Sequence, residues 1–201
     1  MERKGKRSAS AKSKSRARFS YIIAFLPAAV FVGLIVFLLL QPPTAPPPVS
    51  TLTQVTNRGA APDFTLNKLT AEGLSEEKFT LSSTRGKVVF LDFSWWRCPH
   101  CNNMEPVIKE LYSEFSGRGV EFVTIMIDDR QSSIADNAGF VARNQIPWTV
   151  VWDEGGRVSS LYGVKGTPTY IVIDESGNIV RVVSGEQPKQ FLASILNSAL
   201  G

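Results

Sequence analysis

The chain has 201 residues, which is enough for one or two domains. Its formal net charge is +4, but residues 1–20 hold eight of the 22 basic residues and one of the 18 acidic ones. The other 14 basic and 17 acidic residues give the rest of the chain a net charge of −3, so the basic character belongs to the N-terminal segment. A nucleic-acid-binding domain would need a basic patch with a reading module, and the sequence after residue 20 offers neither.

Residues 21–40 are predicted to be a transmembrane anchor. They carry no charge, and a helix of 20 residues crosses a bilayer. The basic head at 1–20 follows the positive-inside rule, which places it in the cytoplasm and the rest of the chain outside the cell membrane. A cleaved signal peptide is the alternative, although its apolar core would be unusually long and no Ala-x-Ala site follows. We therefore expect a single-pass membrane protein with an uncleaved anchor.

Residues 41–59 are predicted to be a linker. Their first half is rich in proline, and such a segment adopts an extended polyproline conformation that acts as a semi-rigid spacer. The linker would hold the following domain, residues 60–201, away from the membrane.

The domain at 60–201 is predicted to alternate strands with helices. Strands are expected at 61–66, 79–81, 88–94, 120–127, 148–152, 169–173 and 179–183, from their apolar, β-branched and aromatic content. Helices are expected at 102–115, 131–144 and 187–200, with a helical turn at 158–162. This order, which ends in a hairpin, indicates an α/β domain with a central mixed sheet.

The only two cysteines, Cys98 and Cys101, stand two residues apart between a predicted buried strand and a predicted helix. At the start of a helix the first cysteine meets unpaired N–H groups and the positive end of the helix dipole, which favour its thiolate. The second cysteine, one turn on, can reach back to close a disulfide. A structural zinc site needs about four ligands, and the chain has only two cysteines and one histidine. A static disulfide that closes so small a loop would stabilise the fold little. The spacing therefore predicts a redox-active pair.

The domain resembles a thioredoxin-fold domain of the membrane-anchored TlpA-like kind, the group that includes the ResA and CcmG thiol–disulfide oxidoreductases of cytochrome c maturation. The motifs that carry the resemblance stand in order along residues 60–201: Ala61-Pro62-Asp63-Phe64, Leu81 with Arg85-Gly86-Lys87, Cys98-Pro99-His100-Cys101, Pro106, Gly163 to Thr169, and Ile173-Asp174 with Gly177 and Ile179. The resemblance implies that protein thiols or disulfides are the substrates and that the chain needs no cofactor or metal besides its disulfide.

The resemblance also implies roles for single residues. Cys98 matches the nucleophile that attacks a substrate disulfide, and Cys101 matches the more buried resolving cysteine. Pro168 matches a cis-proline that faces the pair, which would free the Thr167 backbone to pair with an extended substrate; an ordinary trans proline is the alternative. Asp92 matches a buried acid whose raised pKa suits it to move the proton of Cys101, unless its position on the strand lets it reach solvent.

The residues just before Cys98 depart from the family pattern. Trp95 and Trp96 are interpreted as a hydrophobic rim for partner docking or, alternatively, as core. Arg97 stands where the family usually has a tryptophan. Glu105 lies one place later than a glutamate common in the relatives, so the resemblance gives it no role.

The direction of electron flow depends on opposing features. Pro99-His100 resembles strongly oxidising relatives, and positive charge on His100 and Arg97 would stabilise the thiolate of Cys98 and make the disulfide more oxidising. Asp92, if ionised, would destabilise the Cys98 thiolate and make the disulfide less oxidising. The pattern between residues 120 and 170, which has no inserted helical domain, favours a reductase of cytochrome c apoproteins or misoxidised proteins that is supplied by a membrane electron donor.

Three other functions stay open at this point. A disulfide-forming oxidase of exported proteins would need a membrane electron acceptor instead of a donor. A copper-binding assembly protein of the same fold typically adds a distant histidine ligand, and the single histidine here lies inside the cysteine motif. A peroxidase of the peroxiredoxin kind would need a Thr-x-x-Cys arrangement, which Cys98 lacks.

Overall fold

The computed structural model describes residues 59–201. The predicted basic head, transmembrane anchor and nearly all of the predicted linker lie outside the described residues. Within 59–201, no helix has the length and apolar character needed to cross a membrane.

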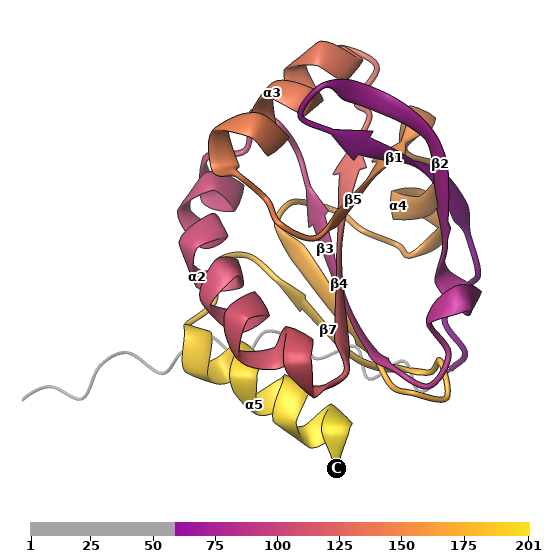
Figure 1. Ribbon diagram of the computed structural model, residues 1–201, viewed down its shortest axis with the longest axis vertical. Coiled ribbons are helices and arrows are strands. Elements are labelled where there is room, and N and C mark those ends of the chain that lie inside the picture. Colours follow the sequence, from indigo (N-terminus) through magenta and orange to yellow (C-terminus); the bar gives the residue numbers. More distant parts are fainter. Residues whose placement is uncertain (1–58) are drawn as a thin grey trace, which may run out of the picture. The chain divides into compact units, whose positions relative to one another are not determined.

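A seven-stranded mixed sheet forms the centre of the domain, in the order β2-β1-β5-β4-β3-β6-β7 (Figure 1). The strands are β1 (Thr65–Thr70), β2 (Gly73–Thr80), β3 (Val88–Ser94), β4 (Val120–Ile127), β5 (Thr149–Asp153), β6 (Thr169–Ile173) and β7 (Ile179–Ser184). Strands β3, β4 and β5 run parallel, whereas β6, β7 and the β1–β2 hairpin pair antiparallel with their neighbours. The predicted α/β architecture with a mixed sheet is confirmed.

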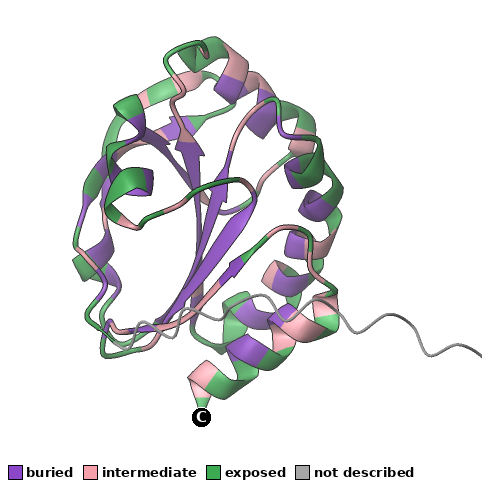
Figure 2. Ribbon diagram, turned by 180° about the vertical axis from the view of Figure 1, so that it is seen from behind, coloured by how far each residue is buried: buried purple, intermediate pink, exposed green. Residues whose placement is uncertain are grey.

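Helices cover both faces of this sheet. They are α2 (Pro99–Phe115), α3 (Ile134–Asn144), α4 (Arg157–Leu161) and α5 (Lys189–Leu200), with 3-10 turns at η1 (Leu81–Thr84), η2 (Ser116–Arg118) and η3 (Glu154–Gly156). Alternate residues of β3 serve the two sides: Phe90 packs with α2 and α5, whereas Leu91 and Phe93 pack with α4 and β1. All seven residues of β3 are buried, and Figure 2 shows the exposed residues on the outer sides of the helices and in the loops around the sheet.

The β1–β2 hairpin differs most from the sequence prediction. The predicted strands at 61–66 and 79–81 are wrong in extent, because β1 runs to Thr70 and β2 begins at Gly73. These two strands lie at the edge of the sheet and carry polar residues on their solvent side, so their pattern lacks a continuous apolar run. Cross-strand pairing supports them instead, including an ion pair of 2.8 Å between Lys68 and Glu77.

Helix starts also differ, because local capping places them. Helix α2 begins at Pro99 rather than at 102, since Cys98 is its N-cap and proline suits the first helical position. Helix α3 begins at Ile134 rather than at 131, since Ser133 and Asp136 form a capping box. The other strands and helices lie within two residues of their predicted bounds.

The β6–β7 hairpin loop is fastened to the segment that leads into β3. The Arg85 Nη1 atom donates a hydrogen bond of 2.8 Å to the carbonyl of Ser176, and the Gly86 N–H donates one of 3.0 Å to the carbonyl of Glu175. Gly177 has a φ of +83°, and a Cβ atom there would overlap the Arg85 guanidinium. These contacts give a structural reason for two of the motifs that the sequence singled out.

Candidate active site

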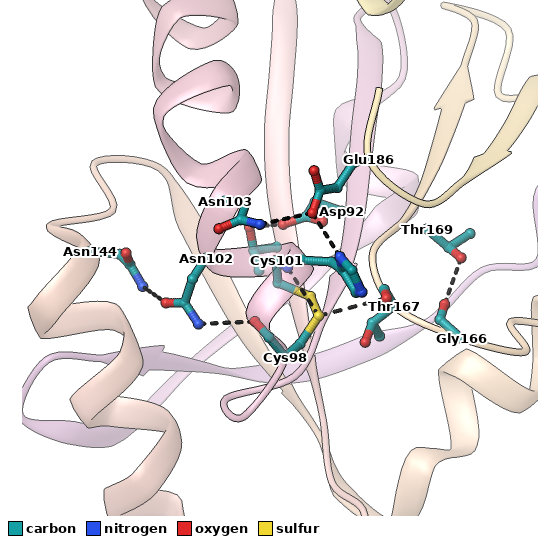
Figure 3. The surroundings of a disulfide bond; sticks show 12 residues. Asp92, Cys98, Cys101, Asn102, Asn103, Asn144, Gly166, Thr167, Thr169 and Glu186 are labelled. Atoms are coloured by element: carbon teal, nitrogen blue, oxygen red, sulfur yellow. Dashed lines mark hydrogen bonds and ion pairs between the residues drawn. A yellow bond between two sulfur atoms is a disulfide. The ribbon is translucent and has the colours of Figure 1, made fainter. Parts of the chain in front are cut away.

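Cys98 and Cys101 form a disulfide at the start of α2, directly after β3 (Figure 3). Both are buried, with 3% and 2% of their surface exposed, so burial does not separate the predicted nucleophile from the predicted resolving cysteine. The Cys101 N–H donates a hydrogen bond of 3.0 Å to the Sγ atom of Cys98. After reduction, this N–H and the positive end of the helix dipole would stabilise negative charge on the Cys98 sulfur.

The loop before β6 faces the disulfide. The Thr167–Pro168 peptide bond is cis, and the Cys98 Sγ atom lies 3.6 Å from the carbonyl oxygen of Thr167 (Figure 3). The Thr169 hydroxyl donates a hydrogen bond of 2.7 Å to the carbonyl of Gly166 and so closes this loop. Two segments that are 69 residues apart in sequence therefore meet at the sulfur atoms, as the thioredoxin-like motif implied.

Asp92 is buried on β3 among the residues that surround the disulfide (Figure 3). Only 2% of its surface is exposed, which rules out the alternative of an aspartate that reaches solvent. Its Oδ2 atom accepts a hydrogen bond of 3.1 Å from the Thr124 hydroxyl, which in turn accepts one of 2.9 Å from the Trp148 Nε1 atom. Burial raises the pKa of Asp92, and the hydrogen bond from Thr124 opposes that shift only in part.

Glu105 is a second buried acid, to which the family resemblance gives no role. It lies on α2 with 2% of its surface exposed, and neither carboxylate oxygen has a hydrogen-bond partner in the described part of the chain. Burial raises the pKa of Glu105, the nearby carboxyl of Asp92 raises it further, and Lys109 opposes both. The sequence contained a usable signal, because Glu105 is one helical turn after Cys101 and therefore shares its face of the helix.

Tyr170 is a third buried polar residue, beside Asp92 and Glu105. It pairs with Asp92 across β3 and β6, and its side chain is buried. Burial raises the pKa of the Tyr170 hydroxyl, and the charges of Asp92 and Glu105 raise it further. The tyrosine therefore stays neutral, and the two carboxyls are the groups in this interior that can exchange a proton near physiological pH.

Trp95 and Trp96 are half-buried beside the cysteines. They pack against a cluster of buried residues that includes Cys98 and Trp152, so each side chain is partly core and partly surface. The Arg97 guanidinium lies over the Trp96 ring, 4.7 Å from its centroid. The two tryptophans therefore contact both Arg97 and the buried cluster around Cys98, and their role in partner docking stays a prediction.

His100 contacts a carboxylate from a loop that is distant in sequence. Its Nδ1 atom lies 2.7 Å from the Oε1 atom of Glu186, in the loop after β7, and the Asn103 side chain donates a hydrogen bond of 2.9 Å to the same oxygen. These two hydrogen bonds lower the pKa of Glu186, with that from Asn103 the larger cause. No sequence signal connects Glu186 with His100, because only the fold brings the two loops together.

The sequence matches the AhpC/TSA family over residues 58–182. The chain belongs to this family. It is 32% identical to the thiol-disulfide oxidoreductase ResA of Bacillus thuringiensis subsp. konkukian over 136 residues, which cover 68% of this chain and 74% of ResA. It is also 32% identical to ResA of Halalkalibacterium halodurans over 125 residues, which cover 62% of this chain and 69% of that protein.

Solved structures show the same likeness. A protein of Chlorobium tepidum assigned as the thiol:disulfide interchange protein DsbE superposes with a TM-score of 0.65 at 30% identity, covering 72% of this chain and 98% of its own. Mycobacterium tuberculosis DsbF superposes with a TM-score of 0.58 at 26% identity, covering 69% of this chain and 95% of its own. With a Cys-x-x-Cys disulfide at the start of α2 and these relatives, this member of the AhpC/TSA family is a thiol–disulfide oxidoreductase.

Proposed function

We propose that this oxidoreductase is a membrane-tethered reductase that acts outside the cytoplasmic membrane on the disulfides of other proteins, in cytochrome c maturation or in disulfide repair. The charge-free segment at 21–40, with eight basic residues before it, supports the tether and the orientation. The likeness to proteins named ResA supports the class of reaction.

The chemistry proposed for the pair is a two-electron reduction of a substrate disulfide. The Cys98 thiolate attacks one substrate sulfur and forms a mixed disulfide, which releases the other substrate sulfur as a thiolate. Cys101 then loses its proton and attacks the Cys98 sulfur, which restores the Cys98–Cys101 disulfide and releases the second substrate thiol. Asp92 is the proposed proton acceptor for Cys101, because its raised pKa places it near neutrality inside an apolar interior. A membrane electron donor would reduce the pair again.

The acidic side chains around the disulfide are the observation that supports electron flow from this protein to its substrate. Asp92 and Glu105 lie in the interior, and Glu186 lies against His100. Glu186 is ionised at neutral pH because its pKa is lowered, whereas Asp92 and Glu105 gain negative charge only as the pH rises through their raised pKa values. Negative charge near the cysteines disfavours a thiolate and therefore favours the disulfide form, which makes the pair more reducing.

Disulfide formation is the second candidate. The Pro99-His100 pair and the N–H bond to the Cys98 sulfur favour it, because both stabilise a thiolate. Metal binding has less support, since the described residues contain no group of three or more His, Cys, Asp or Glu side chains that could hold a metal ion.

The reduction potential of the purified full chain in mild detergent, measured against glutathione buffers, decides between the two redox directions. A value near about −270 mV, as in thioredoxin, is the expected result. A value near about −120 mV would overturn the reductase and establish an oxidase. As a control, Cys98→Ala should abolish both glutathione exchange and insulin reduction.

The location is tested separately in intact protoplasts. Protease added outside should cut the predicted linker at 41–59 and release the folded domain, while an alkaline wash leaves the N-terminal fragment in the membrane. Full protection of the domain, or release of the whole chain by the wash, would contradict the proposed tether.

A further inference from the structure

The loop after β7 brings a carboxylate to the first turn of the active-site helix. The Asn103 side chain donates a hydrogen bond to one carboxylate oxygen of Glu186 (Figure 3). His100 donates a second hydrogen bond to the same oxygen in the tautomer with a proton on Nδ1. Both residues are exposed positions of α2. His100 lies between the cysteines, and Asn103 follows Cys101 by two residues. The carboxylate is therefore fixed to the same helical turn that carries both sulfur atoms.

This loop is anchored on the other side of the site as well. The Gly185 N–H donates a hydrogen bond of 2.8 Å to the carbonyl of Pro168, and Gly185 has a φ of +82°, a conformation that suits glycine. The residue before Glu186 is thus bound to the loop that faces the disulfide. Glu186 connects the cis-proline loop with α2, so its charge stays at a set place beside the cysteines.

We propose that Glu186 is a positioning residue whose negative charge lowers the net charge around Cys98 by one unit. This charge lowers the reduction potential of the Cys98–Cys101 disulfide and makes the pair more reducing. The inference rests on the oxidoreductase activity and deepens the proposed reductase function. It names the group that counteracts the Pro-His sequence between the cysteines, which by itself favours an oxidising pair.

The sign of the effect is the same for either charge state of His100. If the imidazole is protonated, the carboxylate of Glu186 neutralises it within an ion pair. If the imidazole is neutral, it can donate its Nδ1 hydrogen, and the carboxylate adds a negative charge near the sulfur. In both cases the Cys98 thiolate is less stable than it would be without Glu186, and the disulfide is favoured over the dithiol.

A graded charge series tests this inference in the full chain. The reaction is the exchange of the dithiol protein with glutathione disulfide, which yields the protein disulfide and two glutathione molecules. Glu186→Gln should lower the equilibrium constant of this reaction about threefold, because the repulsion between one unit charge and a nearby thiolate at a solvated surface corresponds to about that factor. The corresponding rise in reduction potential is about 14 mV at 29.6 mV per tenfold. Glu186→Lys changes the charge twice as much and should lower the constant about ninefold.

Glu114→Gln is the matched control. The side chains of Glu186 and Glu114 are both 43% exposed and each contacts a basic side chain, but Glu114 stands near the C-terminal end of α2. This variant should leave the equilibrium constant unchanged. The shifts at Glu186 should also shrink at about 1 M salt, where the Debye length is about 3 Å, whereas a loss of loop structure would persist.

The inference fails if Glu186→Gln changes the constant no more than Glu114→Gln does, or if Glu186→Lys gives no larger change than Glu186→Gln. Circular dichroism spectra of the variants check that the fold is intact. The differences between variants test Glu186, whereas the absolute potential of the unchanged protein tests the reductase, so the failure of one is distinguishable from the failure of the other.

Discussion

Asp92 and Glu105 place two carboxyl groups inside the domain at neighbouring points of β3 and α2. Burial raises the pKa of both, so the folded protein keeps its protons at pH values where the unfolded chain has lost them. Their contribution to stability is therefore complete below about pH 4, the ordinary range of free carboxyls. It is lost as the pH rises through the raised pKa values, because the folded protein must then bury a charge.

Asp92→Asn should flatten this pH dependence. In guanidinium chloride unfolding of the oxidised protein, the free energy of unfolding of the unchanged chain should fall between pH 5 and pH 8. The variant should lose much of that slope and be more stable than the unchanged chain at pH 8 by on the order of 2 kcal/mol. Glu76→Gln, which removes an exposed carboxylate from β2, is the control and should keep the full slope. An unchanged slope in Asp92→Asn would contradict a buried acid with a raised pKa.

At the residue scale, motifs located the parts of the site that lie close together in sequence. Cys98, Cys101 and Asp92 fall within ten residues of one another, and the strand-to-helix pattern fixes their relation. The burial of Glu105 was also predictable, since helical periodicity alone places it on the inner face of α2. Glu186 was not, because its hydrogen bonds to His100 and Asn103 span more than 80 residues and exist only after the sheet has formed.

At the element scale, the sequence predicts best where an apolar run is buried on both sides. Strand β3 and strand β4 were predicted with their observed bounds, and strand β6 likewise, because all three lie in the middle of the sheet. The hairpin of β1 and β2 was mispredicted, because at the sheet edge pairing with a neighbour decides more than the side chains do. The boundaries of α2 and α3 depended on single capping residues, which periodicity does not register.

The hydrogen bonds between the β6–β7 loop and the segment before β3 should contribute measurably to stability. Gly177→Ala should lower the free energy of unfolding by about 2 kcal/mol, since an alanine resists a positive φ and its Cβ displaces the Arg85 guanidinium from the Ser176 carbonyl. Gly119→Ala is the control, because Gly119 has a φ of +90° with open space around it and should cost only the backbone part, about 1 kcal/mol.

Chemical denaturation of both variants and of Arg85→Ala separates the two contributions. In the Arg85→Ala background, Gly177→Ala should cost no more than Gly119→Ala does. Equal costs for Gly177→Ala and Gly119→Ala in the unchanged chain would show that the arginine contact contributes nothing to stability.

At the scale of the whole molecule, the redox state of the pair and the stability of the fold are linked. The disulfide closes a loop with a sequence separation of only three residues, so it restricts the unfolded chain little. The difference in stability between the oxidised and reduced proteins therefore reports mainly how the folded surroundings treat a disulfide compared with a dithiol. Strong oxidants are those in which the fold stabilises the reduced form.

For the proposed reductase, the oxidised protein should be the more stable one. The two free energies of unfolding should differ by about 1.4 kcal/mol for every 30 mV by which the folded pair lies below the unfolded pair in potential. Guanidinium chloride unfolding with and without dithiothreitol measures this difference, and the Cys98→Ala/Cys101→Ala double variant should show none. A reduced form more stable than the oxidised form would mean that the helix N-terminus and His100 outweigh the ionised acids around the pair, and that electrons flow from substrate thiols to this protein.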